Sequence, residues 1–298
     1  MRLVPGTVTA RDFPAERVEA DRKGRRISVI VPARDEEDTI GAVVATIRQE
    51  LMERHHVVDE LVVVDDGSSD ATAAVAKAAG AEVVDAASVL PEHGTEHGKG
   101  QAMWRGLHVT SGDIVAYCDA DIRSFGPEFV LGVVGPLLAS DQPAFAKGFY
   151  ARPLDGRDGE GGRVTELTAR PLIALLFPHL GPLVQPLAGE CAGRREVLEA
   201  VPFVGGYGVD LGLLIDITAR FGRDAIIQAD LGRRIHRNRP LSQLSAQSLA
   251  IWQLGMERAG LIPGDQPVVL ERPGNDPLTL RFSERPPLAE ISARLETA

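Results

Sequence analysis

Apolar and polar positions in the first half of the chain follow two patterns in turn, one typical of buried strands and one typical of helices. Short apolar runs rich in β-branched residues predict strands at residues 27–31, 61–64, 82–84 and 114–118. Apolar residues at helical spacing, or runs of good helix formers, predict helices at residues 40–51, 70–79 and 99–109. Strands this apolar must be buried on both faces of the sheet. The order therefore predicts an α/β fold, a mostly parallel sheet with helices on both faces and right-handed crossovers.

Polar residues and glycine mark the ends of two of these helices. Asp38 or Thr39 can cap the helix that begins at Ile40, because both side chains accept hydrogen bonds from backbone N–H groups. Gly80 can end the next helix in the left-handed conformation. These residues predict short turns between strand and helix.

The second half of the chain is less regular. It predicts strands at residues 144–150 and 225–229, helices at 209–220 and 241–259, and a polar, glycine-rich loop at 154–162. Residues 171–189 form the longest stretch without a charge, but three prolines argue against a membrane helix and predict a buried, turn-rich segment. After Gly260 we expect irregular structure or disorder. One domain with C-terminal elaborations is thus favoured over two independent domains.

Charge and cysteine content narrow the class of protein. The 298 residues carry 32 basic and 42 acidic side chains, a net charge of −10, which argues against a general nucleic-acid binder and against docking on anionic membranes by charge. Two cysteines, Cys118 and Cys191, cannot form a disulfide framework or a four-cysteine zinc site. The first residues show no apolar signal segment. We therefore expect a cytoplasmic protein that binds neither nucleic acid nor membrane.

Three acidic motifs follow predicted strands, at residues 32–37, 65–70 and 119–121. Ligands of open parallel sheets bind beyond the carboxyl ends of the strands, so we expect the three motifs to meet at one site. Asp119 and Asp121, separated by one residue, can converge on a hard divalent cation such as Mg²⁺ or Mn²⁺. Such a metal would neutralise a diphosphate leaving group. Each motif alone is also compatible with a solvated turn or a helix cap.

Basic residues in two places could bind phosphates. Lys99 stands between two glycines, which let it reach a ligand while the backbone stays close; a flexible loop lysine is the alternative. The Gly98–Gly100 segment fits neither a Walker A motif nor a dinucleotide fingerprint. Residues 233–239 hold four arginines around His236, a pattern that suits phosphates and a metal ligand but also an exposed basic strand end.

These motifs resemble those of GT-A glycosyltransferases, and more narrowly those of the actinobacterial glucosyl-3-phosphoglycerate synthases. The resemblance runs from about residue 27 to residue 260. Its early motifs, VPARDEEDTI, VVDDGSSDAT, GKGQAMWRGL and GDIVAYCDAD, are shared by many GT-A enzymes. The later ones are GFYARP, GGRVTELTARPL, QPLAGE, GYGVDLGLLID and LGRRIHRNRPL, of which GGRVTEL and IHRNRPL are far more specific.

The resemblance implies an activity and a division of the chain. The activity is retaining, metal-dependent transfer of glucose from UDP-glucose to the 2-hydroxyl of D-3-phosphoglycerate, which yields glucosyl-3-phosphoglycerate, in a homodimeric protein. The implied segments are an N-terminal extension (1–26), a nucleotide-sugar-binding half (27–150), an acceptor-binding half (151–260) and a C-terminal tail (261–298). The sequence offers no convincing carboxylate pair for double displacement, so the departing diphosphate oxygen is expected to take the acceptor proton.

The resemblance also implies site residues, position by position. The donor would contact Ala33, Glu36, Asp65, Asp66, Lys99, Asp119, Ala120, Arg234 and Arg239. The acceptor would contact Gly162, Arg163, Thr165 and Asn238. Lys99, Asp121, the Leu187 carbonyl and Asp210 would lie at the reacting centre, and Asp121 with His236 would ligate Mg²⁺ or Mn²⁺.

Three positions depart from the family pattern. Asp66 stands where serine is frequent, Ala120 is the variable centre of the DxD motif, and Asp210 replaces a glutamate that is one methylene longer. The change at Asp210 bears on sugar recognition and leaves the donor open. A transferase of the mannosyl-3-phosphoglycerate or mannosylglycerate type, using a GDP-sugar, is therefore the nearest alternative.

A polyprenyl-phosphate sugar transferase is the other alternative within the class, but it would need basic amphipathic or membrane-spanning segments. Two different classes fit less well. A nucleotidyltransferase would need a basic glycine-rich loop where this chain has VPARDEEDTI. A non-catalytic sugar-nucleotide sensor need not keep Asp121, His236 and Arg163 together.

Overall fold

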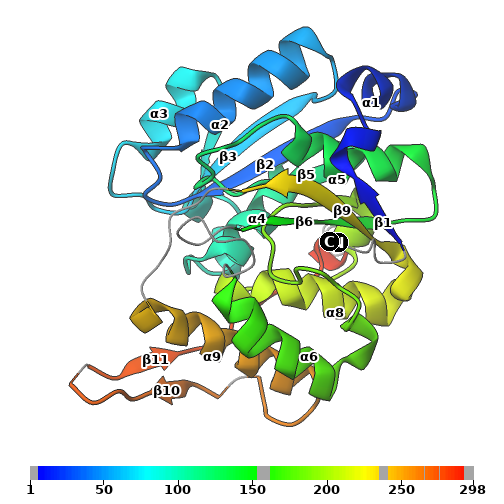
Figure 1. Cartoon of the computed structure of the whole chain (residues 1–298). Coiled ribbons are helices and arrows are strands. Elements are labelled where there is room, and N and C mark those ends of the chain that lie inside the picture. Colours follow the sequence, from blue (N-terminus) through cyan, green and yellow to red (C-terminus); the bar gives the residue numbers. More distant parts are fainter. Residues whose placement is uncertain (1–5, 153–161, 235–240, 265, 275, 292–298) are drawn as a thin grey trace.

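An eight-stranded sheet forms the centre of the molecule (Figure 1). The structure is a computed structural model that describes residues 6–152, 162–234, 241–264, 266–274 and 276–291. The strands stand in the order β1-β9-β6-β7-β5-β2-β3-β4. Their bounds are β1 (Thr7–Thr9), β2 (Ile27–Ala33), β3 (Glu60–Asp65), β4 (Glu82–Asp85), β5 (Ile114–Tyr117), β6 (Phe145–Ala151), β7 (Cys191–Arg194) and β9 (Ile226–Arg233).

All neighbouring strands of this sheet run parallel except at β7, which is antiparallel to both β5 and β6. The predicted mostly parallel sheet is therefore confirmed. Strand β7 was not predicted, because its four residues, Cys-Ala-Gly-Arg, carry no alternating or β-branched pattern.

Helices cover both faces of the sheet, with a separate apolar core on each side. One face holds α1 (Ala15–Asp21), α2 (Ile40–Thr46), its π-helical continuation η2 (Ile47–Arg54), α3 (Thr72–Ala79) and α5 (Glu128–Ala139). The other holds α4 (Lys99–Val109), α6 (Arg170–Leu176), α7 (Arg195–Glu199), α8 (Val209–Phe221) and α9 (Leu241–Arg258) (Figure 1). Short helical turns connect them: η1 (Ala10–Asp12), η3 (Ala86–Ser88), η4 (Pro91–His93), η5 (Thr165–Ala169), η6 (Pro178–Leu180), η7 (Gly206–Gly208) and η8 (Arg223–Ala225).

The strands bury side chains on both faces, as their continuous apolar runs predict. In β3, Leu61 and Val63 enter the core under α2, while Val62 and Val64 enter the core under α4. This two-sided burial explains why the chain shows no polar alternation here.

The ends of the predicted helices agree with the structure in part. The helix at 99–109 matches α4, and Gly80 caps α3 at φ 102° as expected. Thr39 precedes α2, but its side chain makes no capping hydrogen bond to the helix; its hydroxyl donates to Glu36 instead. Thr39 is thus the N-cap residue of α2 as predicted, but it caps the helix without its side chain.

Helix α5 was not predicted, because Gly132, Gly135 and Pro136 disrupt its helical pattern. The glycines serve close packing. A Cβ on Gly132 would lie 2.4 Å from Leu231, and one on Gly135 would lie 2.4 Å from the Phe13 ring. Tertiary contact therefore overrides the low helix propensity of glycine here.

The second half is more regular than the sequence predicted. The uncharged stretch 171–189 begins within helix α6, with Pro171 in the first turn, and only its later part is turn-rich. The predicted strand at 225–229 continues as β9 to Arg233. Of the polar loop at 154–162, all but Gly162 lies outside the described residues.

Both ends of the described chain join the fold. Strand β1 pairs with β9, and β12 (Glu284–Arg285) pairs with β8 (Phe203–Val204). The buried Trp104 ring donates from Nε1 to the Pro286 carbonyl at 2.9 Å. Strands β10 (Val268–Leu270) and β11 (Leu278–Leu280) form a hairpin that extends beyond α9 (Figure 1). The described part of the tail after residue 260 is therefore more ordered than expected, whereas the division into four segments stays a prediction.

Of the helices in the described part of the chain, none combines the length and apolarity that crossing a membrane requires.

Glu60 joins three segments at the amino ends of the central strands. Its carboxylate accepts hydrogen bonds from the Ser111 amide at 2.9 Å, from the Ser111 hydroxyl at 2.6 Å and from Ser28, and it pairs with Arg26 at 3.1 Å. Burial by itself raises the pKa of Glu60, but these donors outweigh it and lower the pKa from 4.5 to about 2.

We expect the stability contributed by Glu60 to be present above pH 4.5 and to disappear as the pH falls toward 2, because the folded pKa lies below the unfolded one. Since the side chain is partly exposed, Glu60→Gln should lower the free energy of unfolding at pH 7 by about 1–3 kcal/mol. Urea unfolding at pH 7 and pH 3 measures this. The exposed Glu82→Gln is the control, and a Glu60→Gln deficit of the same size at both pH values would contradict the assignment.

Candidate functional site

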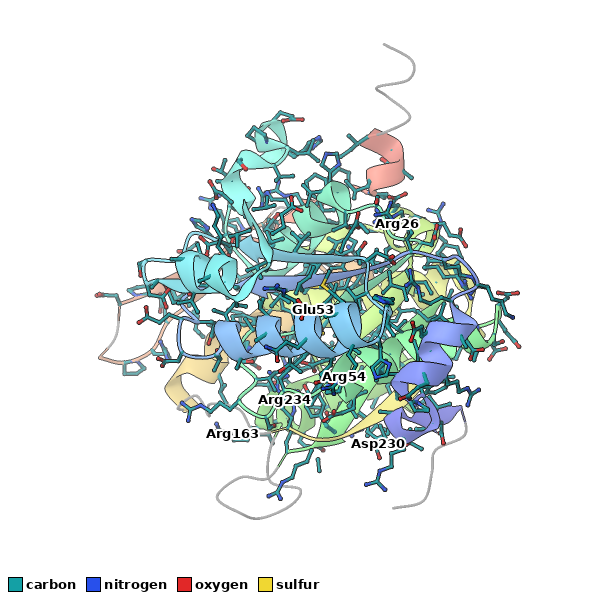
Figure 2. The ribbon with its side chains drawn as sticks, turned by 90° about the horizontal axis from the view of Figure 1, so that it is seen from above. Arg26, Glu53, Arg54, Arg163, Asp230 and Arg234 are labelled. Carbon is teal, nitrogen blue, oxygen red and sulfur yellow. The ribbon has the colours of Figure 1, made fainter. Side chains whose placement is uncertain are left out.

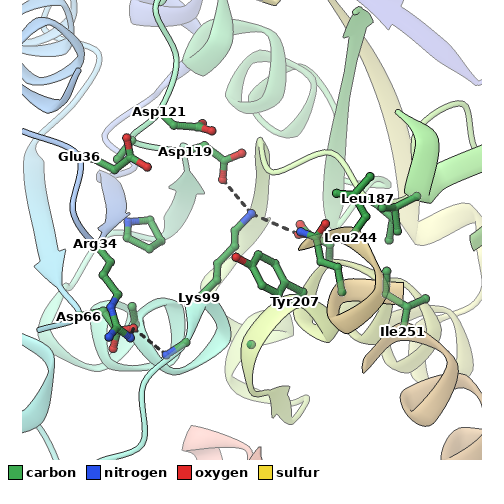
Figure 3. A pocket seen from close by; sticks show the side chains of 18 of the residues that line it. Arg34, Glu36, Asp66, Lys99, Asp119, Asp121, Leu187, Tyr207, Leu244 and Ile251 are labelled. Atoms are coloured by element: carbon green, nitrogen blue, oxygen red, sulfur yellow. Dashed lines mark hydrogen bonds and ion pairs between the residues drawn. The ribbon is translucent and has the colours of Figure 1, made fainter. Parts of the chain in front are cut away.

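A cavity of about 520 Å³ lies at the carboxyl ends of β2, β3 and β5 (Figure 3). All three acidic motifs send residues into it, together with residues from α4, α8 and α9, as expected for a parallel sheet. Its lining comprises Pro32, Ala33, Arg34, Glu36, Asp66, His97, Gly98, Lys99, Ala102, Asp119, Ala120, Asp121, Arg152, Gly162, Arg163, Val164, Thr165, Leu187, Gly206, Tyr207, Asp210, Arg234, Leu244, Gln247 and Ile251.

The first two acidic motifs divide their side chains between the cavity and each other. Asp35 adopts φ 54° and accepts hydrogen bonds from the Ser69 amide at 2.7 Å and hydroxyl at 3.0 Å, which hold its pKa below the usual range. Glu37 accepts from the Ala71 amide at 2.8 Å. These carboxylates join the two turns, and the residues of the first motif that face the cavity are Pro32, Ala33, Arg34 and Glu36.

Asp65 and Asp66 are neighbours in the chain, but only Asp66 lines the cavity. Asp65 accepts from the amide and hydroxyl of Ser68 and is not part of the cavity lining. Asp66 faces the cavity and accepts from the Gly98 amide at 2.7 Å and from His97 at 3.3 Å. Asp66 thereby fixes the segment that leads into α4.

Gly98 lets this segment approach the opposite wall. Its φ of 141° is unfavourable for other residues, and a Cβ there would lie 2.8 Å from the backbone nitrogen of Gly206. Lys99 follows as the first residue of α4 and points into the cavity (Figure 3). The glycine thus has a steric role, and the lysine is not a flexible loop residue.

Lys99 joins two carboxylates that come from distant elements. Its Nζ lies 2.8 Å from Asp119 Oδ1, after β5, and 3.2 Å from Asp210 Oδ2, on α8 (Figure 3). Burial opposes the charge of Lys99, but the two carboxylates raise its pKa well above the usual value. Lys99 is therefore a permanent cation at the centre of the cavity.

Arg234 forms a second buried centre of charge. Its guanidinium lies 2.8 Å from Asp119 Oδ2, 2.5 Å from Asp121 Oδ1 and 3.3 Å from Glu190. Burial raises the pKa of Asp119, yet Lys99 and Arg234 outweigh it and hold that pKa well below its usual range. Glu190, whose side chain is fully buried, has a raised pKa because burial and Asp119 outweigh the attraction of Arg234.

Asp121 is the carboxylate best placed for a cation. Its side chain is 31% exposed, against 22% for Asp119 and 9% for Asp210. Carboxylate oxygens suit Mg²⁺ and Mn²⁺, so the donor type fits the predicted metal. Within the described residues no group of three His, Cys, Asp or Glu side chains could hold a metal by itself. The second predicted ligand, His236, lies outside those residues.

The far end of the cavity combines basic, hydroxyl and apolar groups. Gly162, Arg163 and Thr165 lie just before and within η5 and line the cavity together with Leu187 and Tyr207. Arg163 and Arg234 appear on the same side of the molecule in Figure 2 and line the same cavity. The described residues that we predicted to bind the acceptor therefore line the same cavity as those predicted to bind the donor.

The predicted site is therefore largely assembled. Thirteen of its residues line the cavity, Asp65 does not, and Asn238, His236 and Arg239 lie outside the described residues. Sequence reasoning missed Arg34, His97, Arg152 and Tyr207, although each stands in or beside a quoted motif. Leu244, Gln247 and Ile251 were also missed, and only the folding of α9 over the cavity could reveal them.

This geometry defines a class of protein. Carboxylates and basic side chains at the carboxyl ends of parallel strands, beside a second subsite, are the arrangement of a GT-A glycosyltransferase that uses a nucleotide sugar. The model of the family "Glycosyl transferase family 2" matches residues 28–200.

Three relatives narrow the class. The chain is 45% identical to the glucosyl-3-phosphoglycerate synthase of Mycolicibacterium smegmatis over 93% of both chains. It is 40% identical to that of Petrotoga mobilis, over 91% of this chain and 88% of the other. A crystal structure of the Mycobacterium tuberculosis glucosyl-3-phosphoglycerate synthase, with Mn²⁺, UDP-glucose and phosphoglyceric acid, matches with 42% identity and a TM-score of 0.87, over 97% of this chain and all of that one. The chain belongs to glycosyl transferase family 2, among the glucosyl-3-phosphoglycerate synthases.

Gly189 gives a direct test of the buried charge network. A Cβ at this position would lie 2.1 Å and 2.2 Å from the two carboxylate oxygens of Asp119. We expect Gly189→Ala to displace Asp119 from Lys99 and Arg234 and to lower the free energy of unfolding by about 2–4 kcal/mol. Urea unfolding measures this. The control is Gly41→Ala on α2, where the added methyl would meet one Val75 methyl at 3.0 Å. Equal losses in the two variants would contradict the assignment.

Proposed function

We propose that this protein transfers glucose, with retention of configuration, from UDP-glucose to the 2-hydroxyl of 3-phosphoglycerate with the aid of a divalent metal. The observation that carries the proposal is the single cavity in which Lys99, Asp119 and Asp121 stand beside Gly162, Arg163 and Thr165. The similar crystal structure holds Mn²⁺, UDP-glucose and phosphoglyceric acid, which supports the same substrates here. The UDP-glucose in that structure argues against the GDP-sugar and mannosyl donors that the sequence left open.

The donor is assigned to the end of the cavity formed by the first two acidic motifs. Ala33, Glu36 and Asp66 would contact uracil and ribose there, with Asp119 and Ala120 beside the ribose. Asp65 would support them through the Ser68 turn. Because Asp66 also binds the Gly98 amide, occupation of this pocket would act directly on the segment that carries Lys99.

The diphosphate is assigned to the middle of the cavity. Asp121 and His236 would ligate Mg²⁺ or Mn²⁺, which when bound would neutralise the charge of the leaving group. Arg234 would face the phosphates with a guanidinium that its carboxylate neighbours keep charged, and Arg239 would assist it. Asp119 would then hold Lys99 and Arg234 in place through its ion pairs.

The acceptor is assigned to the far end of the cavity, next to η5. Arg163 would pair with its phosphate, the Gly162 amide and the Thr165 hydroxyl would bind the remaining oxygens, and Asn238 would contribute from the segment after β9. A guanidinium suits this role because it binds phosphate and carboxylate oxygens in pairs. The hydroxyl to be glucosylated would thereby face the Leu187 carbonyl near the reacting centre.

The carboxylates around Lys99 are poor nucleophiles, which supports attack from the face of the leaving group. Asp119 is bound by Lys99 and Arg234, and Asp210 is bound by Lys99 and Lys147. Glu190 is fully buried behind Arg234. Carboxylates engaged in this way stabilise charge and orientation, so a covalent glucosyl intermediate is disfavoured. The departing diphosphate oxygen would take the acceptor proton.

The family resemblance also supports a homodimer that works in the cytoplasm. Sedimentation velocity of the full chain tests the assembly independently of activity.

Asp121 gives the first test of this function. With UDP-glucose, 3-phosphoglycerate and Mn²⁺, we expect the protein to release UDP, and we expect Asp121→Asn to lower kcat/KM at least about 100-fold, because a ligand of the leaving-group metal is lost. EDTA should abolish UDP release, and added Mn²⁺ should restore it. The exposed Asp224→Asn is the control. Absence of UDP release from the unmodified protein would refute the function, and UDP release that survives Asp121→Asn would refute the metal assignment.

Arg163 tests the acceptor subsite separately. Arg163→Ala should raise the KM for 3-phosphoglycerate by about 10- to 100-fold, the equivalent of losing one charge-assisted hydrogen-bonding group, while the KM for UDP-glucose changes by less than about threefold. Steady-state kinetics with each substrate varied in turn measure both constants. Arg11→Ala, at an exposed position remote from the cavity, is the control. A rise of equal size in both constants would contradict the acceptor role.

A further inference from the structure

Lys147 is a buried cation that the reaction as described does not use. It lies in β6 next to Ala146 and Gly148, and its side chain is 2% exposed. In the sheet it stands opposite Cys191 of β7 and Gln228 of β9. A buried ammonium group carries a large desolvation cost and is retained only where a partner compensates for it.

The partner of Lys147 is Asp210. Lys147 Nζ lies 3.0 Å from Asp210 Oδ1, while Lys99 Nζ lies 3.2 Å from Asp210 Oδ2. Lys99 and Asp210 line the cavity, and Lys147 does not. Lys99, which lines the cavity, therefore binds one oxygen of the carboxylate, and Lys147, which lies in the sheet, binds the other.

This arrangement restricts how Asp210 can turn. An Asp carboxylate bound by one lysine can rotate about χ2 and exchange its oxygens, whereas one bound on both oxygens from different elements cannot do so without breaking an ion pair. Each oxygen still has a lone pair for a further donor. Lys99 also pairs with Asp119 at 2.8 Å, whereas Lys147 forms an ion pair only with Asp210 within the described residues.

We propose that Lys147 is a positioning residue of the donor-sugar subsite, which fixes the Asp210 carboxylate so that it accepts hydrogen bonds from the hydroxyls of the transferred hexose. The inference rests on the proposed function, because it takes a nucleotide-bound hexose as the ligand of Asp210. Lys147 itself touches no substrate. It acts through the orientation of Asp210, and its influence is confined to the sugar and does not extend to the nucleotide.

Comparing the affinity for UDP-glucose with the affinity for UDP isolates the contribution of the sugar subsite. Calorimetric titration of Lys147→Met in the presence of Mn²⁺ should show UDP-glucose binding weakened at least about tenfold and UDP binding changed less than about twofold. Lys147→Arg, which keeps the charge, should recover part of the loss. Lys77→Met, at an exposed position on α3, is the matched control and should change neither constant.

A double-mutant cycle tests whether Lys147 acts through Asp210. In an Asp210→Asn background, Lys147→Met should change UDP-glucose binding less than about twofold, because the carboxylate that it orients is gone. If Lys147→Met alone does not fold, Lys147→Gln, which keeps an N–H donor for Asp210 but removes the charge, takes its place in both backgrounds of the cycle. Independent, multiplicative effects of the two substitutions would overturn the proposal.

The outcomes separate this inference from the proposed function. If the unmodified protein releases no UDP from UDP-glucose in the presence of 3-phosphoglycerate and Mn²⁺, the proposed function fails and the inference with it. If the unmodified protein transfers glucose while Lys147→Met weakens UDP and UDP-glucose equally, or weakens neither, the function stands and the positioning role of Lys147 is refuted.

Discussion

The ion pairs of Lys99 are the interaction on which the rest of the site depends. They connect Asp119, at the end of β5, with Asp210, on a helix that follows much later in the chain. The lysine can reach both because Gly98 brings the start of α4 close to the Gly206 backbone, where a side chain would not fit. The cavity therefore has its shape and its charge pattern from one contact between the two halves of the chain.

Balanced burial of charge makes this arrangement stable. Three carboxylates, Asp119, Asp210 and Glu190, are opposed by three cations, Lys99, Lys147 and Arg234. Each buried ion thus has a partner, which offsets the cost of removing it from water. The more exposed Asp121 and Arg163 remain at the cavity surface, where a metal and an anionic acceptor would bind. Although the chain has a net charge of −10, the cavity lining itself is balanced, with five Lys or Arg side chains and five carboxylates.

Prediction from the sequence succeeded in bringing the three acidic motifs to one cavity, because that signal is local. Asp119 and Asp121 directly follow a strand, and the parallel sheet brings this strand end to those of the other two acidic motifs. It failed where a role depends on packing. Glu190 and Lys147 stand in short segments of small and apolar residues, and nothing in their neighbours shows that they enter a charge network. Within one acidic motif, only the folded turns show that Asp66 faces the cavity while Asp65 holds Ser68.

The sequence by itself determined the parallel core of the sheet, the place of the acidic motifs and the kind of site they form, because β-branched runs, helical spacing and strand-end polarity are local properties. Only the tertiary structure decided the antiparallel insertion of β7, the helix α5, the ordered tail and the partner of each charged side chain. These features depend on contacts between residues far apart in the chain, such as Gly132 against Leu231 and Lys147 against Asp210. Steric fit and charge compensation across such distances leave no periodic signal in the sequence.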